Sequence, residues 1–216
     1  MEIWLLVKEY LPILLKAAGV TLGISGLSLV FSLIIGLIMG MFRISKNFIL
    51  TWIATLYINA IRGTPLLIQI LIVYFGIPSL LNISFSAFTA GVVIMSIYTG
   101  AYMAEIYRSG IESVDIGQTE AGRSLGLSNS LTMRLIVLPQ AIRKMIPTFV
   151  NQITIMIKDT SLLSVIGVVE LTMQGQMIYS VNFKTFEILI IVAIIYFIIV
   201  YALTRFSIWI EGRIKV

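Results

Sequence analysis

The sequence has no cysteine and no histidine among its 216 residues. Their absence excludes disulfide bonds, thiol chemistry and the usual thiolate and imidazole zinc sites, so we expect no metal site. Charged residues are also scarce, at 12% of the chain, whereas soluble domains carry roughly 25%. The chain has no GxxxxGK[ST] phosphate-binding loop and no credible acid–base or nucleophilic residues, so we expect neither catalytic residues nor nucleotide hydrolysis. These absences favour a membrane protein over a soluble enzyme.

Hydrophobic residues make up 59% of the chain and gather in long runs with few charges. Because a spanning helix needs about 20 mostly apolar residues, these runs predict an all-α polytopic membrane protein. It forms a single transmembrane domain over residues 1–216, with five transmembrane helices. The predicted spans are residues 12–42, 48–80, 85–108, 147–171 and 186–210.

The second run is interrupted by Arg62. Divided there, it yields pieces of about 14 and about 19 residues, and the first is too short to cross a bilayer. We therefore expect one long span, either tilted or kinked at Pro65.

Basic residues are distributed unevenly between the two ends of these runs. With the N-terminus outside, the inner segments hold ten Lys and Arg residues and the outer segments hold two or three. This asymmetry predicts an outer N-terminus, a cytoplasmic C-terminus and a cytoplasmic segment at 112–142, between spans 3 and 4. The basic loops also explain the net charge of +5, so no nucleic-acid partner is expected. Since the chain opens on Glu2 and not on a basic segment, we expect no cleavable signal.

Glycines recur at intervals of three or four along the first run, which permits close approach of another helix. Internal packing and a dimer seam are the two interpretations of this pattern. The residues are Gly19, Gly23, Gly26, Gly36 and Gly40.

The segment EAGRSLGLSNSLTMRLIVLP, residues 120–139, is unusually polar for this chain. Gly126 falls where a left-handed residue would end a helix, and Ser128 can cap a second helix that begins at Asn129. We expect that second helix to stop near Pro139. The predicted product is a helical hairpin at the inner membrane face, which either lies on the membrane surface or docks into a cytoplasmic partner.

The spacing of this segment resembles the EAA motif of bacterial ABC importer permeases. The matching positions are Glu120, Ala121, Gly122, Gly126, Ile136, Leu138 and Pro139. Gly122 departs from the motif, which usually has alanine there. The stretches RGTPLLIQILIVYFGIP, GAYMAEIYRSGIESV, MRLIVLPQAIR and KDTSLLSVIGVVEL also resemble the branch of this family that takes up polar amino acids such as histidine, glutamine and arginine.

The resemblance implies a multi-pass permease subunit of the bacterial cytoplasmic (inner) membrane that moves polar amino acids, cationic ones included, inward by alternating access. Its implied partners are a second permease copy, two ATPase subunits and an extracytoplasmic amino-acid-binding protein. A homodimer is favoured over a paralogous heterodimer. ATP and Mg would be held by the ATPase, with no cofactor on this chain. The alternative is a secondary transporter or channel without an ATPase, which would have no use for the hairpin.

In this family the EAA loop forms a coupling helix that sits in a cleft of the ATPase. By position, the resemblance assigns that role to Glu120, Ala121, Gly122, Arg123, Gly126, Leu138 and Pro139.

Charged residues within the predicted spans are the candidates for a substrate path. A charge at mid-bilayer costs about 2.5–3.5 kcal/mol on insertion scales, so such residues should face the bundle interior or water. Lys158 and Asp159 are adjacent and lie about 100° apart on a helix, which prevents them from satisfying each other. If the helix breaks here, Asp159 or Thr160 could cap a half-helix that binds a carboxylate. Fixed bonds between spans are the alternative.

Arg62 is expected to face a substrate carboxylate or to pair with Glu105 or Asp159, and Glu105 is expected to pair with Arg108. Tyr98 and Tyr102 share a helix face with Glu105. The predicted substrate path comprises Arg62, Tyr98, Glu105, Lys158, Asp159, Thr160 and Ser161. Glu170 and Gln174 are expected near the outer surface, either where a binding protein docks or in a solvated loop.

Overall fold

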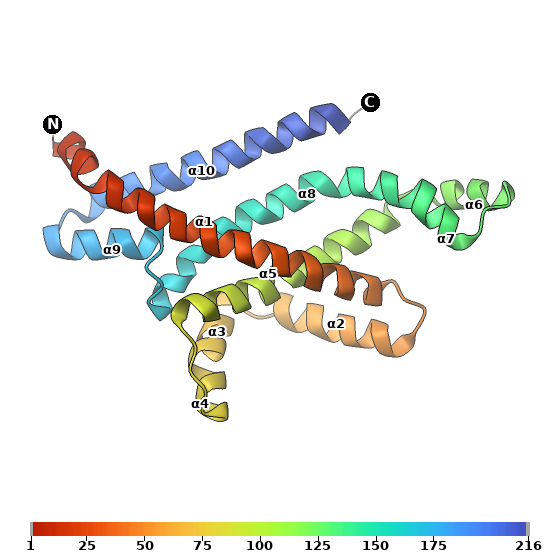
Figure 1. The fold of residues 1–216 in the computed structure, drawn as a ribbon, viewed down its shortest axis with the longest axis horizontal. Helices are drawn as coiled ribbons and strands as arrows, with labels where there is room; N and C mark the ends of the chain where they lie inside the picture. The colour runs from red at the N-terminus through yellow and green to blue at the C-terminus, as the bar shows by residue number, and fades with distance from the viewer. Residues whose placement is uncertain (1, 215–216) are drawn as a thin grey trace.

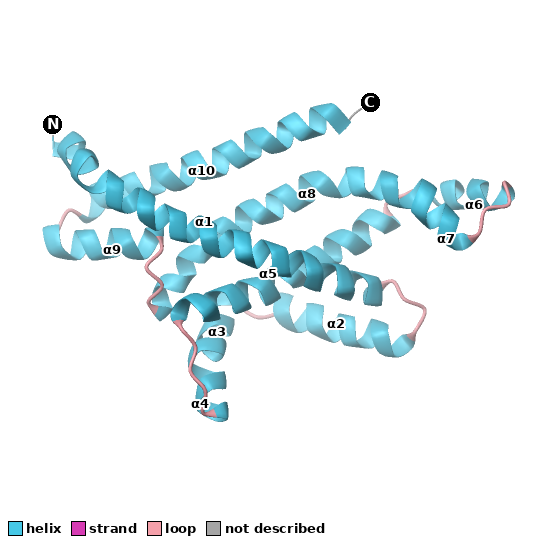
Figure 2. Cartoon of the chain, in the orientation of Figure 1, coloured by secondary structure: helices cyan, strands magenta, loops and turns pink. Residues whose placement is uncertain are grey.

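The structure is a computed structural model that describes residues 2–214, and within that range every regular element is a helix (Figures 1 and 2). The predicted all-α class is confirmed. The α-helices are α1 (Glu2–Arg43), α2 (Phe48–Arg62), α3 (Leu66–Leu71), α4 (Ile77–Leu81), α5 (Ala87–Glu112), α6 (Ile116–Ser124), α7 (Asn129–Thr132), α8 (Leu138–Asp159), α9 (Leu171–Asn182) and α10 (Thr185–Ile214). Two π-helical segments, η1 (Ile72–Gly76) and η2 (Met133–Val137), and one 3₁₀ helix, η3 (Thr160–Ile166), connect them.

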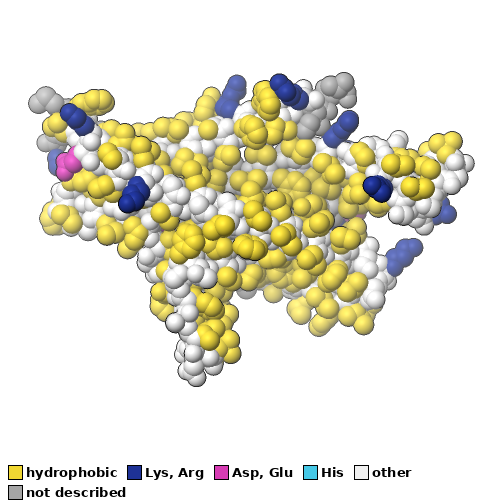
Figure 3. Space-filling model, in the orientation of Figure 1, with side chains coloured by type: hydrophobic (Ala, Val, Ile, Leu, Met, Phe, Trp, Pro, Cys, Tyr) yellow, Lys and Arg dark blue, Asp and Glu magenta, His cyan; other side chains and the backbone are white. Residues whose placement is uncertain are grey.

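Three helices are long and apolar enough to cross a membrane on their own: Trp4–Arg43, Ala87–Glu112 and Thr185–Ile210. Two pairs of shorter helices reach that length only together, and each pair is bent. The described residues therefore hold three spans, or up to five if each bent pair is one span. Hydrophobic side chains cover most of the face seen in Figure 3, and the visible Lys and Arg side chains lie along its edges and at its ends.

The second predicted span is not one kinked helix. Its two halves, α2 and the segment from α3 to α4, meet at 103° across residues 63–65, and α3–α4 projects away from the other helices in Figure 1. Pro65 has no N–H to continue the ladder. The side chain of Gln69 replaces the lost donors, because its Nε2 donates to Ile61 O at 2.8 Å and to Thr64 O at 3.2 Å. Local hydrogen bonds thus stabilise a full break where a tilt or kink was expected, and the expectation that the two halves make one span stays a prediction.

The hairpin's second helix was expected to stop near Pro139, but it continues past this residue. The chain is helical from α7 through η2 into α8, and Pro139 lies in the first turn of α8. In η2 the helical hydrogen bonds reach back five residues and not four, so that Leu138 N–H bonds to Met133 O. The same arrangement precedes Pro78, where Ile77 N–H bonds to Ile72 O. A π-turn ahead of a proline accommodates the missing N–H without ending the helix.

The other helix limits also differ from the predicted ones. α8 begins nine residues before residue 147, and Pro147 lies inside it. α5 continues to Glu112, four residues past the predicted end at 108. Where lipid begins along these helices stays a prediction.

The centre of the protein is one apolar cluster to which five elements contribute. Ile24 of α1, Ile70 of α3, Ile94 of α5, Met156 of α8 and Leu163 of η3 are all at most 2% exposed. This cluster fixes the broken helix at residues 63–65 and the end of α8 against the same face of α5.

Only some glycines of the first run serve internal packing. Gly36 lies against Met103 and Ala104 of α5, and a Cβ at Gly40 would lie 3.0 Å from the Tyr107 Cβ. Gly19, Gly23 and Gly26 have no neighbour within 4 Å of such a Cβ. The internal-packing interpretation is thus confirmed for Gly36 and Gly40.

We expect Gly36→Val to destabilise the protein, because the added methyl groups would push α1 away from α5; overpacking of this kind costs about 1–3 kcal/mol. The measurement is the midpoint of thermal unfolding of the purified protein in detergent. Gly23→Val is the matched control, since it makes the same change of residue on the same helix in open space. Equal midpoints for the two variants would contradict the packing described here.

Candidate functional site

The hairpin at residues 116–132 forms the turn that the sequence predicts. Asp115 caps α6 by accepting from Gly117 N at 2.7 Å. Gly126 has a left-handed φ of +82° and follows the end of α6. Ser128 caps α7 by accepting from Leu131 N at 3.3 Å. Figure 1 shows α6 and α7 together at one end of the molecule, beyond the end of α5.

Most residues assigned to coupling lie on the surface of this hairpin or just after it. Glu120, Ala121, Arg123, Gly126 and Pro139 are exposed, and Leu138 is partly buried. The Arg123 side chain is held by Asn129, whose Oδ1 accepts from its Nη1 at 2.6 Å.

Gly122 is different, because it is buried inside the hairpin. A Cβ there would lie 2.8 Å from Ile136 Cδ1 and 2.9 Å from Thr132 Cγ2. Its small size lets α6 pack on the helix that follows, so within this chain Gly122 shapes the hairpin's interior and leaves the outer face to its neighbours.

The clearest electrostatic feature of the fold is one carboxylate surrounded by three guanidinium groups. Glu105 of α5 lies 2.8 Å from Arg108 Nη2, 3.7 Å from Arg62 Nη1 and 3.9 Å from Arg43 Nε. Arg108 is also paired with Glu112. The predicted Glu105–Arg108 and Arg62–Glu105 pairs are confirmed, and these contacts join the ends of α1 and α2 to α5.

Aromatic rings extend this cluster along α5. The Arg62 guanidinium lies over the Tyr102 ring, 5.2 Å from its centroid. The hydroxyls of Tyr98 and Tyr102 are 3.1 Å apart. Arg43 is held from the other side, because its Nη1 donates to Thr55 Oγ1 at 2.8 Å. The charge is therefore fixed by partners on α1, α2 and α5 together.

The α-helix ends at Asp159 and the chain continues as the 3₁₀ helix η3, and neither Asp159 nor Thr160 caps a half-helix. Asp159 makes no capping bond to η3, and Thr160 Oγ1 donates to Ile157 O at 2.7 Å. The capped half-helix is α9 instead. Its cap is Glu170, whose carboxylate accepts from Thr172 N at 2.9 Å and from Met173 N at 2.8 Å.

Glu170 is fully buried, at 0% exposure, so it lies neither in a solvated loop nor on a surface open to a docking protein, and its expected place near the outer side of the membrane stays a prediction. Its Oε2 accepts from Tyr196 Oη of α10 at 2.7 Å and from Thr21 Oγ1 of α1 at 3.5 Å. Thr21 Oγ1 in turn accepts from Leu171 N at 3.2 Å. One carboxylate thus joins α1, α9 and α10. The signal in the sequence was an acidic residue just before the helical run LTMQGQMIYSVN, which suits an N-cap.

Four of the seven predicted substrate-path residues line two separate pockets, and Tyr98, Asp159 and Thr160 line neither. Lys158 and Ser161 line a pocket of about 340 Å³ with Thr172 and Tyr196. A second set, described next, lines a pocket on the α5 side of α8. Adjacent positions on a helix point in different directions, so the KDTS segment does not act as one surface.

The second pocket has a volume of about 220 Å³ and lies between α2, α5 and α8. Sequence reasoning missed the α8 contribution to it. The lining residues are Arg62, Tyr102, Glu105, Ile106, Ser109, Thr148, Asn151 and Gln152.

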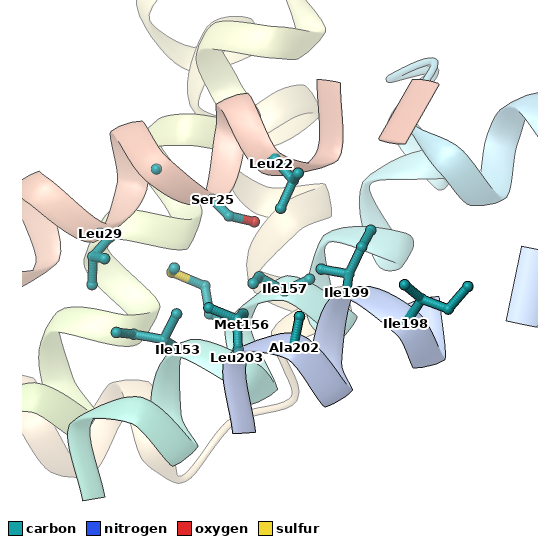
Figure 4. A pocket seen from close by; sticks show the side chains of 11 residues that line it. Leu22, Ser25, Leu29, Ile153, Met156, Ile157, Ile198, Ile199, Ala202 and Leu203 are labelled. Carbon is teal, nitrogen blue, oxygen red and sulfur yellow. The ribbon is translucent and has the colours of Figure 1, made fainter. Parts of the chain in front are cut away.

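A larger pocket, of about 460 Å³, is apolar and separate from these charges. Figure 4 shows its lining, which includes Leu22 and Leu29 of α1, Met156 of α8 and Leu203 of α10. The red oxygen in this view belongs to Ser25. A pocket with this lining cannot recognise a zwitterion, since it offers no charged partner.

Comparisons with known proteins assign the chain to a family. Residues 32–216 match the family described as binding-protein-dependent transport system inner membrane component. The chain belongs to this family. It is 43% identical over 214 residues to the glutamine transport system permease protein GlnP of Escherichia coli K12, covering 99% of this chain and 98% of that one. It is 40% identical over 209 residues to the probable amino-acid ABC transporter permease protein PatM of Vibrio harveyi, covering 96% and 94%.

Solved structures agree with this assignment. A crystal structure of an amino acid ABC transporter with histidines superposes with a TM-score of 0.92 at 37% identity, over 97% of both chains. An inward-facing MetNI methionine ABC transporter shares the fold, with a TM-score of 0.79 at 17% identity over 96% of this chain and 99% of that one. The chain is therefore an ABC transporter permease subunit, as the motif resemblance predicted.

We expect Tyr196→Phe to lower the free energy of unfolding by about 1.5–3 kcal/mol, because a buried hydrogen bond to a carboxylate is lost. Thermal unfolding in detergent measures this. Tyr179→Phe is the matched control: the Tyr179 hydroxyl makes no hydrogen bond to the described residues, and this variant should unfold like the wild type. A Tyr196→Phe variant as stable as the control would contradict the role given to Glu170.

Proposed function

We propose that this chain is the membrane-spanning subunit of an ATP-driven importer of polar amino acids, with glutamine as the first substrate to test. The observation that carries the proposal is the 43% identity to a glutamine transport system permease over nearly the whole of both chains. The charged and polar residues inside the helix bundle support it, because recognition of an amino acid needs both a cation and an anion.

In the proposed topology the chain crosses the bacterial inner membrane five times, with each bent pair as one crossing. The N-terminus is outside and the C-terminus cytoplasmic. Two observations support this: the excess of Lys and Arg in the inner segments, and the position of the start of α1 at the end of the molecule opposite the α6–α7 hairpin in Figure 1.

The proposed assembly contains a second permease copy, two ATPase subunits that carry ATP and Mg, and an external binding protein. The α6–α7 hairpin is the proposed coupling element. It follows α5 after only three residues, 113–115, and α5 carries Glu105 and one of its three arginine partners, Arg108. Displacement of the hairpin by the ATPase would therefore act on the end of the helix that holds this cluster.

The proposed transport step is alternating access around the polar residues of α5 and α8. Arg62 and Glu105 offer opposite charges to a zwitterion. Asp159 is half-buried at the end of α8 and makes no hydrogen bond with the described residues, which leaves its carboxylate available to a substrate ammonium group.

We expect Gly126→Pro and Glu120→Lys to leave the protein in the membrane but to abolish substrate-stimulated ATP hydrolysis. Proline requires a φ near −65°, which is incompatible with the +82° at Gly126. Glu120→Lys reverses an exposed charge on α6. Glu9→Lys, the same reversal on an exposed residue of α1, is the control and should hydrolyse ATP normally. Normal coupled hydrolysis in both hairpin variants would count against the coupling role.

The proposed substrate is tested by reconstituting the permease with its ATPase subunits and binding protein in liposomes and measuring uptake of a panel of amino acids. We expect uptake of glutamine that depends on ATP, and a loss of uptake of at least tenfold in Asp159→Asn with assembly intact. Co-purification distinguishes the alternative. A permease that takes up amino acids although no ATPase subunit accompanies it after mild solubilisation would favour a secondary transporter.

A further inference from the structure

We propose that Gly110 of α5 and Met145 of α8 form a rigid joint that carries movement of the α6–α7 hairpin into both helices at once. The two residues are positioning residues, which act on the substrate path through the helices that they join. The inference rests on the proposed function and deepens it, because it names the route by which an ATPase seated on the hairpin acts on the membrane helices.

The hairpin is connected to those helices by two links that are not α-helical. Residues 113–115 connect α5 to α6, and the π-helical segment η2 connects α7 to α8. Helices commonly bend at a π-turn, and hinges are commonly a few loop residues. Displacement of the hairpin would therefore only bend these links if no other contact held them.

A buried apolar cluster holds both links. It contains Val114 of the first link and Val137 of the second, together with Ala141 and Met145 of α8. Each of these four residues is at most 9% exposed. Close-packed interiors have low compressibility and transmit displacement. The cluster therefore joins the end of α5, both links and the start of α8 into one body.

The joint itself is a direct contact between two helices. A Cβ at Gly110 would lie 2.3 Å from Met145 Cγ and 2.5 Å from Met145 Cε. Gly110 is buried, and Met145 is only 3% exposed. The missing side chain at Gly110 thus lets Met145 lie directly against the backbone of α5, with no room between the two helices for independent movement.

Two hydrogen bonds cross the same junction. Lys144 Nζ donates to Ser113 O, at the end of α5, over 2.6 Å, and a cation suits the carbonyl end of a helix. Gln140 Nε2 donates to Gln118 Oε1 of α6 over 3.2 Å. These bonds tie α8 to the end of α5 and to the hairpin, so the hairpin is fixed to both helices.

A second glycine contact lies near the other end of α5. A Cβ at Gly91 would lie 3.0 Å from Leu163 Cδ1 of η3, which continues α8. The two glycines are about 28 Å apart along α5 at 1.5 Å per residue. Between these contacts α5 and α8 both line the pocket that contains Arg62 and Glu105. Movement of the joint is therefore passed to two walls of that pocket together.

The first test reconstitutes the permease with its ATPase subunits and binding protein in liposomes. It measures how much of the preferred amino acid of the panel is taken up per ATP hydrolysed. We expect Met145→Ala to lower this ratio at least fivefold, because the cavity it leaves loosens the joint while the ATPase still contacts the hairpin. A general loss of folded protein lowers uptake and hydrolysis together and leaves the ratio unchanged.

Met95→Ala is the matched control. It makes the same truncation of a fully buried methionine of α5, but in the central cluster and not at the joint. We expect it to keep the ratio within twofold of the wild type.

The second test locks the joint. The chain has no cysteine, so an introduced pair is the only pair of thiols in it. Met145 Cβ is one bond, about 1.5 Å, from Met145 Cγ, so Gly110→Cys combined with Met145→Cys places two Cβ atoms within about 4 Å, as a disulfide requires. We expect the oxidised double variant to couple uptake to hydrolysis within twofold of the wild type, because a rigid joint loses nothing when it is crosslinked. The wild type treated with the same oxidant controls for effects on the partner subunits.

The outcomes separate this proposal from the proposed function. An unchanged ratio in Met145→Ala, or an equal fall in Met95→Ala, would overturn the joint and leave the importer standing. So would a loss of uptake of more than tenfold on oxidation that a reductant reverses, since α5 and α8 would then have to move against each other. Failure of the pair to crosslink would contradict the contact itself. If the wild type with all its partners transports no amino acid, the proposed function fails and the joint fails with it.

Discussion

A helix that breaks among apolar neighbours must find new partners for the backbone groups it releases, and this constraint shapes the whole fold. In lipid there is no water to supply them, and each unsatisfied group costs several kcal/mol. The break at residues 63–65 is satisfied by the Gln69 side chain, and the start of α9 by Glu170. Both residues are buried. These two side chains make it possible for short helices to turn back inside the bundle.

The breaks have a functional consequence, because they place the ends of the helices α2 and α8 next to the other helices of the bundle. The end of α2 carries Arg62 to Glu105, in the part of α5 that leads into the hairpin. The end of α8 leaves Asp159 half-buried without a hydrogen bond to the described residues. Uninterrupted helices would have satisfied their own backbone hydrogen-bonding groups and would have placed these charged residues at the membrane surfaces. Arg62 is held by Glu105 and Asp159 is left without a hydrogen bond to the described residues, and in the proposed function these charged groups meet the polar substrate.

The hairpin was predictable because its signals are local. Gly126 needs no neighbour to favour a left-handed φ, and Ser128 caps a helix that starts one residue later. The Glu105–Arg108 pair followed from the spacing of three residues on one helix, and Glu105 was one of the partners expected for Arg62 because intramembrane charges seek partners. Glu170 and Gln152 could not be predicted in the same way. Their burial depends on which elements of distant sequence, α1 and α10 for one and α2 and α5 for the other, pack against them.

The sequence by itself determined the helical class, the family and the turn chemistry of the hairpin, because apolar run length, motif spacing and glycine conformations act over a few residues. Only the tertiary structure decided that the second predicted span is broken at 103°, that Pro139 is accommodated inside a helix, and that four of the predicted path residues divide between two pockets. The physical reason is that a proline ends, bends or widens a helix according to which side chains replace its missing N–H, and those side chains are brought there by packing.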